Sequence, residues 1–326
     1  MKIRILSVLL LLSITLTGCG NGKNNNSSSV TENSINTENS TGDEKGSQKL
    51  TISSMKGPTG MSLAYLKNLD KYEIKIQDSI EEQMSSIQKS DSDIFLVPSN
   101  LFAKLQNNKG DLKVISPNIG MPLTLIGSKK IDSVKDMKGS TISLTGKGAI
   151  PEAILRKILE RSEMTEDDIN INFIQDPTQA VPQLLKDENS FALLPEPFVT
   201  AVLTKNDKLQ RSLDIKKLWE EMSLPPVITS VIVVKDLTYS EKTEAIYEFL
   251  QVYNKGIDNI LKDPNNFANI IEEMGIVKAP IAEKSITNID FLKYEKDEFT
   301  DDLSQFLEVI LDLNPELIGG KIPVME

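Results

Sequence analysis

Four short polar turns in the sequence carry the side chains best suited to holding a small solute. Each turn follows an apolar run that predicts a strand and precedes a run with helical spacing. In open α/β sheets, ligands bind at the carboxyl ends of strands, where helix N-termini offer free backbone N–H groups and the positive end of the helix dipole. The residues predicted to bind a ligand are Gly57, Thr59, Gly60, Met61, Ser62, Ser99, Asn100, Thr145, Lys147, Gly148, Ala149, Glu196 and Phe198.

Several of these residues also have a purely structural interpretation. The glycines can serve turns that need positive φ, and Ser99 and Thr145 can be plain helix caps. Glu196 can act only as the acidic partner of a helix dipole. Lys147 can be a solvated surface charge, and Phe198 can belong to the core. The sequence leaves both interpretations open.

Charged side chains near the turns limit the choice of solute. Arg156 and Arg161 fall within an expected helix and Arg211 in an expected polar loop, so no arginine clamp on a carboxylate or sulfonate is expected. Backbone N–H groups and Lys147 would then hold an anion, whereas Glu196 would favour an amine or a ring N–H. An anionic solute, a solute of both polarities and a neutral heterocycle therefore remain open.

The rest of the composition argues against catalysis. The chain contains no His and a single Cys, Cys19. These counts exclude histidine-based triads and the usual zinc sites, and they leave the globular part without a thiol. Gly146-Lys147-Gly148 lacks the spacing of a phosphate-binding loop. We expect neither an enzyme nor a cofactor or metal site, and the net charge of −11 argues against nucleic acid.

The first residues have the features of a bacterial secretion signal. Lys2 and Arg4 precede an apolar run, 5–16, that is too short to span a bilayer. The run ends in Leu16-Thr17-Gly18-Cys19, which resembles the lipoprotein signal, and this resemblance implies cleavage and acylation of Cys19, with palmitate as a fitting chain. The alternative is an ordinary signal peptide with Cys at its cleavage site. We expect a signal peptide over 1–18 and lipid anchoring on the extracytoplasmic face of the cell membrane.

Residues 19–48 differ in composition from the remainder. They are rich in Asn, Ser, Thr and Glu, with too few large apolar side chains to offset chain entropy. We expect this stretch to be a disordered tether that links the anchor to a globular domain.

Residues 49–326 alternate between strand and helix patterns, which predicts an α/β fold with largely parallel sheets. Two copies of a strand, glycine turn and helix, near residues 57 and 147, suggest two lobes joined by crossing strands near 123–127 and 228–234. Lobe 1 would comprise 49–126 plus 231–326, and lobe 2 would comprise 127–230. The expected strands are 50–54, 93–97, 112–116, 123–126, 141–144, 169–174, 190–194 and 227–234. The expected helices are 61–69, 79–89, 98–105, 149–161, 177–186, 241–261, 265–274, 281–286 and 298–313, with another opening at 195–197.

Six motifs in order carry a resemblance to a known family. They are Gly57-Pro58-Thr59-Gly60-Met61, Asp93-Ile94-Phe95-Leu96-Val97-Pro98, Val134-Lys135-Asp136-Met137-Lys138-Gly139, Gly146-Lys147-Gly148-Ala149-Ile150-Pro151-Glu152, Leu194-Pro195-Glu196-Pro197-Phe198 and Asn314-Pro315-Glu316-Leu317-Ile318-Gly319-Gly320-Lys321-Ile322-Pro323. Together they resemble the nitrate/sulfonate/taurine-type solute-binding proteins of ABC importers, particularly a clostridial branch. The resemblance spans 49–324.

The resemblance implies a type II periplasmic-binding fold, whose two lobes close on a small solute and deliver it to a membrane permease and ATPase. We expect a monomer. Two alternatives are a ligand sensor that does not serve transport and an enzyme similar to the thiamine-pyrimidine synthase of the same fold family. The enzyme relies on a histidine, which this chain lacks.

Overall fold

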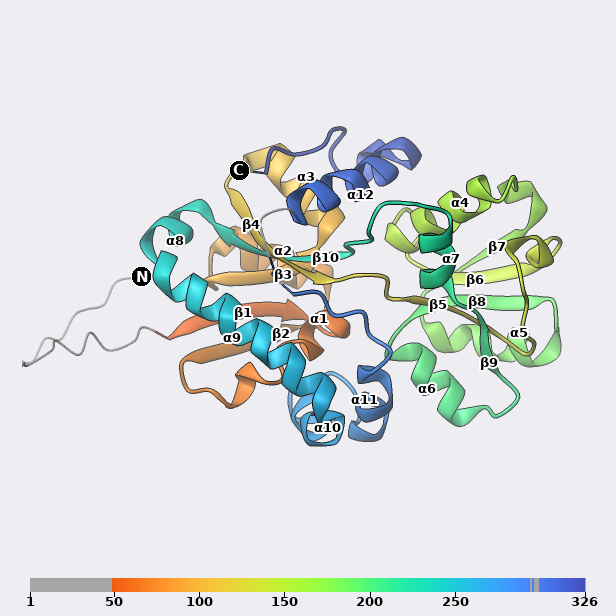
Figure 1. The fold of residues 1–326 in the computed structure, drawn as a ribbon, viewed down its shortest axis with the longest axis horizontal. Helices are drawn as coiled ribbons and strands as arrows, with labels where there is room; N and C mark the ends of the chain where they lie inside the picture. Colours follow the sequence, from red (N-terminus) through yellow and green to blue (C-terminus); the bar gives the residue numbers. More distant parts are fainter. Residues whose placement is uncertain (1–48, 294, 296–298, 326) are drawn as a thin grey trace, which may run out of the picture. The chain divides into compact units, whose positions relative to one another are not determined.

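The computed structural model describes residues 49–293, 295 and 299–325. The predicted signal peptide, the predicted lipidation site Cys19 and the predicted tether lie outside these residues. Within the described part, two five-stranded sheets with helices on their faces form the fold (Figure 1). The predicted α/β class and the two-lobed architecture are therefore confirmed. We call each sheet with its helices a lobe.

The first sheet combines strands from both ends of the chain. It has the order β2-β1-β3-β10-β4, and β10 runs antiparallel to both of its neighbours. The inner strands β3 and β10 are nearly continuous apolar runs because helices cover both faces of the sheet. The strands are β1 (Leu50–Met55), β2 (Tyr72–Gln77), β3 (Ile94–Pro98), β4 (Leu112–Ile119) and β10 (Ser230–Lys235).

The second sheet repeats this arrangement. Its order is β7-β6-β8-β5-β9, and β5 occupies the place that β10 has in the first sheet, again antiparallel to its neighbours. The inserted strand of each sheet thus reaches it from the other lobe. The strands are β5 (Leu123–Gly127), β6 (Thr141–Thr145), β7 (Asn170–Ile174), β8 (Ser190–Pro195) and β9 (Gln210–Leu213).

The helices follow the amphipathic patterns of the sequence. Helix α9 buries Phe249, Tyr253 and Ile257 on one face. Helix α12 contacts both α3 and α4, and one buried apolar cluster extends from the first lobe into the second. The helices are α1 (Pro58–Met61), α2 (Ile80–Lys89), α3 (Ser99–Lys109), α4 (Ile150–Arg161), α5 (Val181–Lys186), α6 (Phe198–Lys205), α7 (Ile215–Glu221), α8 (Asp236–Glu241), α9 (Thr243–Lys262), α10 (Pro264–Glu273), α11 (Ala279–Ile286) and α12 (Phe299–Leu313).

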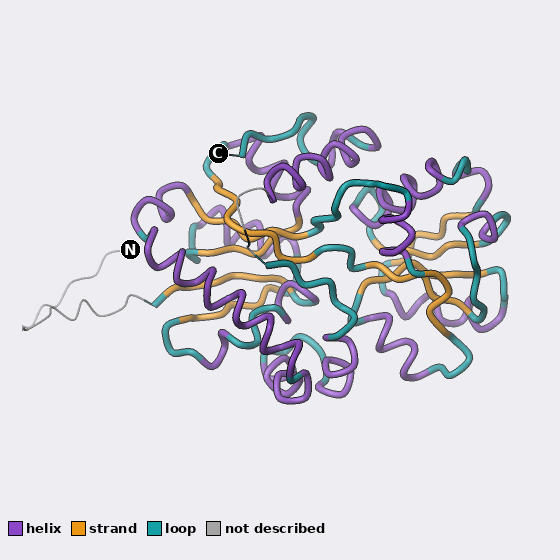
Figure 2. The backbone as a smooth tube through the Cα atoms, viewed as in Figure 1, coloured by secondary structure: helices purple, strands orange, loops and turns teal. Residues whose placement is uncertain are grey.

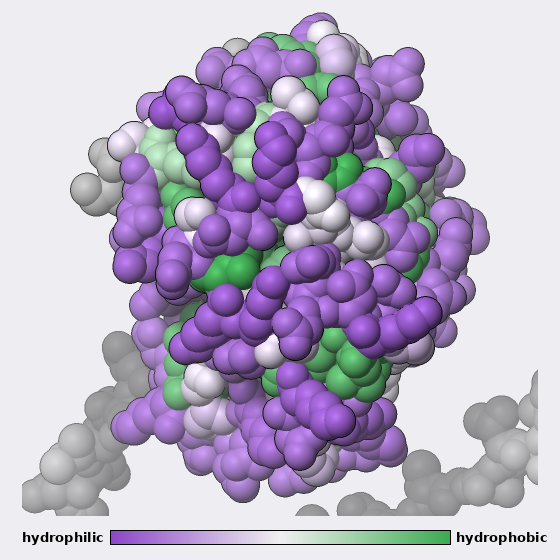
Figure 3. All heavy atoms as spheres, turned by 90° about the vertical axis from the view of Figure 1, so that its right-hand side faces the viewer, coloured by the Kyte–Doolittle hydropathy of each residue, from purple (hydrophilic) through white to green (hydrophobic). Residues whose placement is uncertain are grey.

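The surface at the end of the second lobe is mainly hydrophilic. Apolar side chains on this face form small groups separated by polar ones (Figure 3). Among the described residues, no helix combines the length and the apolar character needed to cross a bilayer.

Three differences from the sequence-based expectation bear on the candidate site. Strands β2 and β9 were not predicted, because both lie at sheet edges and lack a buried apolar run. The helix expected over 61–69 begins earlier, as α1, and is followed by a 3-10 turn, Leu66–Asn68. Pro58 is favourable at the first helical position, and Gly57 at φ 99° is the N-cap.

The third difference concerns the boundary between the lobes. Strand β5 pairs with β8 and β9, so residues 123–126 belong to the second sheet, whereas the predicted boundary placed them in lobe 1. The chain therefore passes between the sheets through 120–122 and returns through 222–229, both drawn as loops in Figure 2. A third segment, 287–292, runs beside the first crossing, where Gly120 N–H donates to the Asp290 carbonyl at 2.8 Å.

Candidate functional site

The strand pairing places all four predicted turns at the boundary between the lobes. The last residue of β3, Pro98, pairs with Ser230, where the chain enters β10 from the second lobe. The last residue of β8, Pro195, pairs with Leu123, where the chain enters β5 from the first lobe. Strands β1 and β6 lie parallel to β3 and β8, so their carboxyl ends share the same edges. This is the placement that a ligand site at the ends of parallel strands requires.

Two of the turns are bonded directly to the crossing segments. The Ser99 N–H donates to the Thr229 carbonyl at 3.0 Å, and the Glu196 N–H donates to the Pro122 carbonyl at 3.4 Å. A change in the path of either crossing must therefore move the turn that is bonded to it.

The first turn directs part of its predicted binding set into the first lobe. Met61 is 0% exposed and packs in the core. Ser62 is also 0% exposed, and its hydroxyl donates to the Thr59 carbonyl at 2.6 Å. The Thr59 hydroxyl donates to the Met55 carbonyl at 3.1 Å. A Cβ on Gly60 would lie 2.7 Å from the Met55 carbonyl oxygen, so this glycine serves close packing. The Met61 side chain therefore packs in the core, and the Ser62 hydroxyl is already bonded within its own turn.

The second turn presents an uncapped helix N-terminus. Pro98 is the N-cap of α3, no side chain caps the helix, and its first turn contains no acidic residue. The Ser99 hydroxyl is buried and finds no hydrogen-bond partner among the described residues. The interpretation of Ser99 as a helix cap is therefore wrong. Asn100, the next predicted residue, is half-buried.

The third turn already holds a carboxylate. The Gly148 N–H donates to Glu152 Oε2 at 2.6 Å, and the other oxygen of Glu152 pairs with Arg156. This carboxylate interacts favourably with the N-terminus of α4, where we had expected an anionic solute. Thr145 does not cap α4, whose N-cap is Ala149. Lys147 is exposed, with its Nζ 5.5 Å from the centroid of the Phe173 ring.

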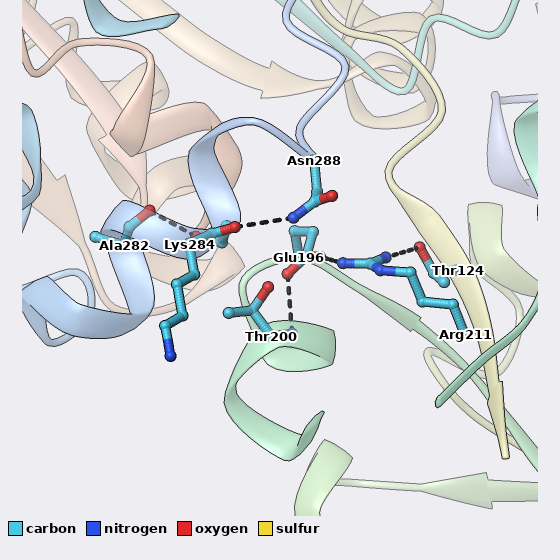
Figure 4. A network of polar contacts seen from close by, with 8 residues as sticks. Thr124, Glu196, Thr200, Arg211, Ala282, Lys284 and Asn288 are labelled. Carbon is cyan, nitrogen blue, oxygen red and sulfur yellow. Dashed lines mark hydrogen bonds and ion pairs between the residues drawn. The ribbon is translucent and has the colours of Figure 1, made fainter. Parts of the chain in front are cut away.

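The fourth turn holds an ion pair whose carboxylate is buried. Glu196 is 1% exposed, accepts a hydrogen bond from Thr200 N–H at 3.1 Å and pairs with Arg211 (Figure 4). Another guanidinium nitrogen of Arg211 donates to Thr124 Oγ1 at 3.0 Å. Glu196 therefore does act on the first turn of α6, and Arg211 neutralises it. Phe198 is 43% exposed, so its interpretation as a core residue is wrong.

The position of Arg211 corrects the sequence-based expectation that no arginine lies near the candidate site. We had placed it in a polar loop, but it lies on β9, whose four residues are too few and too polar to show a strand pattern. No local signal in the sequence could have paired it with Glu196. A cavity of about 590 Å³ opens beside this network, and its lining includes Thr124, Arg211 and Asn288.

The two lobes therefore differ in electrostatics at their shared boundary. In the second lobe, the N-termini of α4 and α6 each interact with a glutamate that is paired with an arginine. In the first lobe, the described residues place no carboxylate at the N-terminus of α3 and no partner on the Ser99 hydroxyl. An incoming hydrogen-bond acceptor is favoured at α3.

Comparisons with known proteins agree with this architecture. Residues 115–267, somewhat less than half of the chain, match the sequence model of the family described as NMT1/THI5 like. No curated protein sequence matches the chain.

Solved structures match over most of the chain. An ABC transporter structure from Parabacteroides distasonis is 22% identical, with a TM-score of 0.72, and the match covers 85% of this chain and 97% of that one. The periplasmic aliphatic sulphonate binding protein SsuA from Escherichia coli is 14% identical, with a TM-score of 0.66 and coverage of 86% and 94%. The ligand binding component of an ABC-type import system from Staphylococcus aureus is 12% identical, with a TM-score of 0.59 and coverage of 80% and 91%. The chain thus has the two-lobed fold of the periplasmic binding proteins of ABC transporters, and its central part matches the NMT1/THI5-like family.

Proposed function

We propose that this chain is the solute-binding protein of an ABC importer. It captures a small polar or anionic organic solute between its lobes, of the sulfonate, nitrate-like or heterocyclic kind, and delivers it to a permease and ATPase. The fold and the turns at the lobe boundary support this proposal. Binding without chemical turnover fits a sequence that has no His and only one Cys.

The observation that carries the proposal is the environment of Ser99. Its hydroxyl is buried at the N-terminus of an 11-residue helix and has no partner among the described residues. A buried polar group left without a hydrogen bond costs about 1–3 kcal/mol, and such groups are uncommon in native proteins. A solute oxygen placed there would accept from the hydroxyl and gain from the helix dipole.

The charges of the second lobe favour an anionic solute over a cationic one. Glu152 and Glu196 are the acidic residues of the two second-lobe turns, and each is paired with an arginine. A cationic solute would have to compete with Arg156 or Arg211 for its partner. Lys147, exposed on the third turn, adds positive charge near the boundary.

Thermal-shift screening of the purified chain followed by calorimetry tests the proposal. The probes are ethanesulfonate, taurine, nitrate and an aminopyrimidine. A solute that binds the folded state raises the melting temperature with its concentration. We expect the best probe to carry an anionic oxygen and Ser99→Ala to weaken its binding about ten- to hundredfold, because hydrogen bonds to charged groups contribute about 1.5–3 kcal/mol.

Ser285→Ala is the matched control. Ser285 is equally buried, but its hydroxyl donates only to the Ala282 carbonyl of its own helix. This variant should bind the probe as the wild type does. Unchanged affinity in Ser99→Ala, or best probes that lack any acceptor group, would contradict the proposed site.

We also propose that Cys19 carries the lipid anchor and that the protein acts as a monomer on the extracytoplasmic face of the membrane. The support is the signal-like N-terminus and the place of Cys19 as the only cysteine of the chain.

A further inference from the structure

Asn118 lies at the centre of a buried network beneath the first turn. It is 0% exposed and stands near the end of β4, two residues before Gly120. Its amide nitrogen donates to Ser62 Oγ at 3.0 Å and to Tyr253 Oη at 2.8 Å, and its amide oxygen accepts from Ser230 Oγ at 3.0 Å. An asparagine amide has two N–H donors and one carbonyl oxygen, and all three groups are engaged here.

The hydrogen bonds continue outward from Asn118 in two directions. Ser62 and Tyr253 each accept a bond from the amide, so each keeps its own hydroxyl proton for donation. Ser62 donates to the Thr59 carbonyl at 2.6 Å, within the first candidate turn. Tyr253 donates to the main-chain carbonyl of Leu292 at 3.4 Å. The Leu292 N–H in turn donates to the main-chain carbonyl of Asn118 at 2.9 Å.

Asp290, two residues before Leu292, connects this network to the second lobe. Its carboxylate accepts from Met121 N–H at 2.9 Å, on the first crossing segment. The other carboxylate oxygen lies 2.6 Å from Lys216 Nζ, and Lys216 belongs to α7 of the second lobe. Hydrogen bonds, together with the backbone of residues 290–292, therefore join Thr59 to Lys216.

We propose that Asn118 and Asp290 are positioning residues that couple the turn 57–62 to the position of the second lobe. If the lobes move, the bond to Lys216 changes, and the segment 290–292 transmits that change through Tyr253 and Asn118 to the turn. The proposal rests on the proposed function only for what the turn binds. Ser62, Asn118 and Tyr253 are buried inside the first lobe, whereas Asp290 and Lys216 line the cavity at the boundary.

Backbone amide hydrogen exchange, followed by mass spectrometry on the full chain without solute, tests the coupling. The Met61 and Ser62 amides are protected by bonds to the Gly57 and Pro58 carbonyls. Lys216→Met cuts the far end of the path, and we expect exchange over 57–62 to rise roughly two- to fivefold. The effect is modest because partly exposed ion pairs contribute little. Lys216→Arg, which keeps the charge, should restore slow exchange.

Lys217→Met is the matched control. Lys217 is the next residue on the same helix, but it pairs with Glu221 of that helix and not with the first lobe. Its replacement should leave exchange over 57–62 at the wild-type rate. Equal acceleration by both variants would indicate general loosening and overturn the coupling, as would no acceleration in Lys216→Met.

A second pair of variants interrupts the path inside the first lobe. Tyr253→Phe removes the hydroxyl that links Asn118 to Leu292, whereas Tyr65→Phe removes a hydroxyl for which the described residues show no hydrogen bond. We expect Tyr253→Phe to accelerate exchange over 57–62 and to reduce the further effect of Lys216→Met, because the bond from the Leu292 N–H to the Asn118 main-chain carbonyl remains. If the effects of Tyr253→Phe and Lys216→Met simply multiply, the path between them carries no coupling. Because no solute is used, failure here is distinct from failure of the proposed function.

Discussion

At the scale of single residues, the pair Glu196 and Arg211 joins two partners of unequal burial. Glu196 is 1% exposed, whereas the side chain of Arg211 is 37% exposed. Loss of the arginine leaves a charge enclosed by protein, but loss of the carboxylate leaves an arginine that water can still reach. The two substitutions should therefore differ in cost, although they remove the same ion pair.

We expect Arg211→Met to lower the free energy of unfolding by about 3 kcal/mol and Glu196→Gln by about 1–2 kcal/mol. Gln at position 196 retains an oxygen that can accept from Thr200 N–H. Urea unfolding of the two variants measures the difference. Lys217→Met, which removes an exposed pair, is the control and should change stability by less than about 0.5 kcal/mol. Equal losses in the two main variants would contradict the assigned asymmetry.

Tyr253 gives a prediction for alkaline pH. Burial raises the pKa of Tyr253 from 10.0 to about 12, with the bonds from Asn118 and Ser62 acting in the opposite direction. Because the folded-state pKa lies above the unfolded one, this residue's contribution is fully present below pH 10 and is lost as the pH rises towards about 12. A tenfold difference in proton affinity between the folded and unfolded chain corresponds to about 1.4 kcal/mol of stability.

Urea unfolding of the wild type and Tyr253→Phe at about pH 9 and about pH 11.5 isolates this effect. We expect the wild type to lose about 2 kcal/mol more than the variant between these two conditions. Comparison of the two proteins cancels the titration of the other groups. An equal loss in both would show that Tyr253 ionises as easily in the folded chain as in the unfolded one.

At the scale of elements, the segment 287–292 is packed tightly against the first crossing. A Cβ on Gly120 would lie 2.1 Å from Asp290 Oδ2 and 2.8 Å from its Cγ, so no side chain fits there without moving the carboxylate. That carboxylate bonds Met121 and Lys216. The glycine is therefore required by close approach and not by an unusual backbone angle.

We expect Gly120→Ala to cost about 1–3 kcal/mol of folding free energy, because it overpacks a filled site. Asp290→Ala removes the carboxylate and so the obstacle. In that background Gly120→Ala should cost clearly less, and the two changes should be non-additive in a thermal or urea unfolding cycle. Strict additivity would mean that the alanine meets some other atom.

Helix N-termini in equivalent positions of the fold differ in whether a carboxylate already interacts with them. Helices α3, α4 and α6 all begin at the carboxyl ends of parallel strands, as predicted. Only the structure shows that Glu152 and Glu196 already interact with two of them. Helix α3 differs because the buried Ser99 hydroxyl at its N-terminus has no hydrogen-bond partner among the described residues.

At the scale of the whole molecule, the two sheets have equivalent strand orders. In each sheet the fourth strand, β10 or β5, is the one that the chain enters from the other lobe. This arrangement brings the carboxyl ends of both sheets to the same boundary, so a solute bound there can contact both lobes. Helix α12 adds a contact of its own between the lobes, since it packs on α3 and on α4.

The proposed anchor gives a prediction at the same scale. A Cys19→Ala protein should be released into the culture medium, because it lacks the residue proposed to be acylated. It should bind its solute as the wild type does. Fractionation of cells and medium, with calorimetry of the released protein, measures both properties. Ser27→Ala, a change within the predicted tether, should leave the protein with the cells. Loss of solute binding in Cys19→Ala would contradict the independence of anchor and domain.

The sequence by itself determined the α/β class, the two lobes and the position of the four turns at strand ends. These features follow from local patterns, since apolar runs, helical spacing and glycine turns are encoded by neighbouring residues. It did not reveal the edge strands β2 and β9, whose residues are too polar or too few to show a period.

The tertiary structure decided which side chains of the turns face the boundary and which charges are compensated. Ser62 and Met61 are turned inward by packing that involves Asn118 and the core beneath them. Arg211 meets Glu196 only because β9 pairs with β5 beside β8. Such contacts join residues that are distant in sequence, so their energies have no local signature, and only the folded chain can determine them.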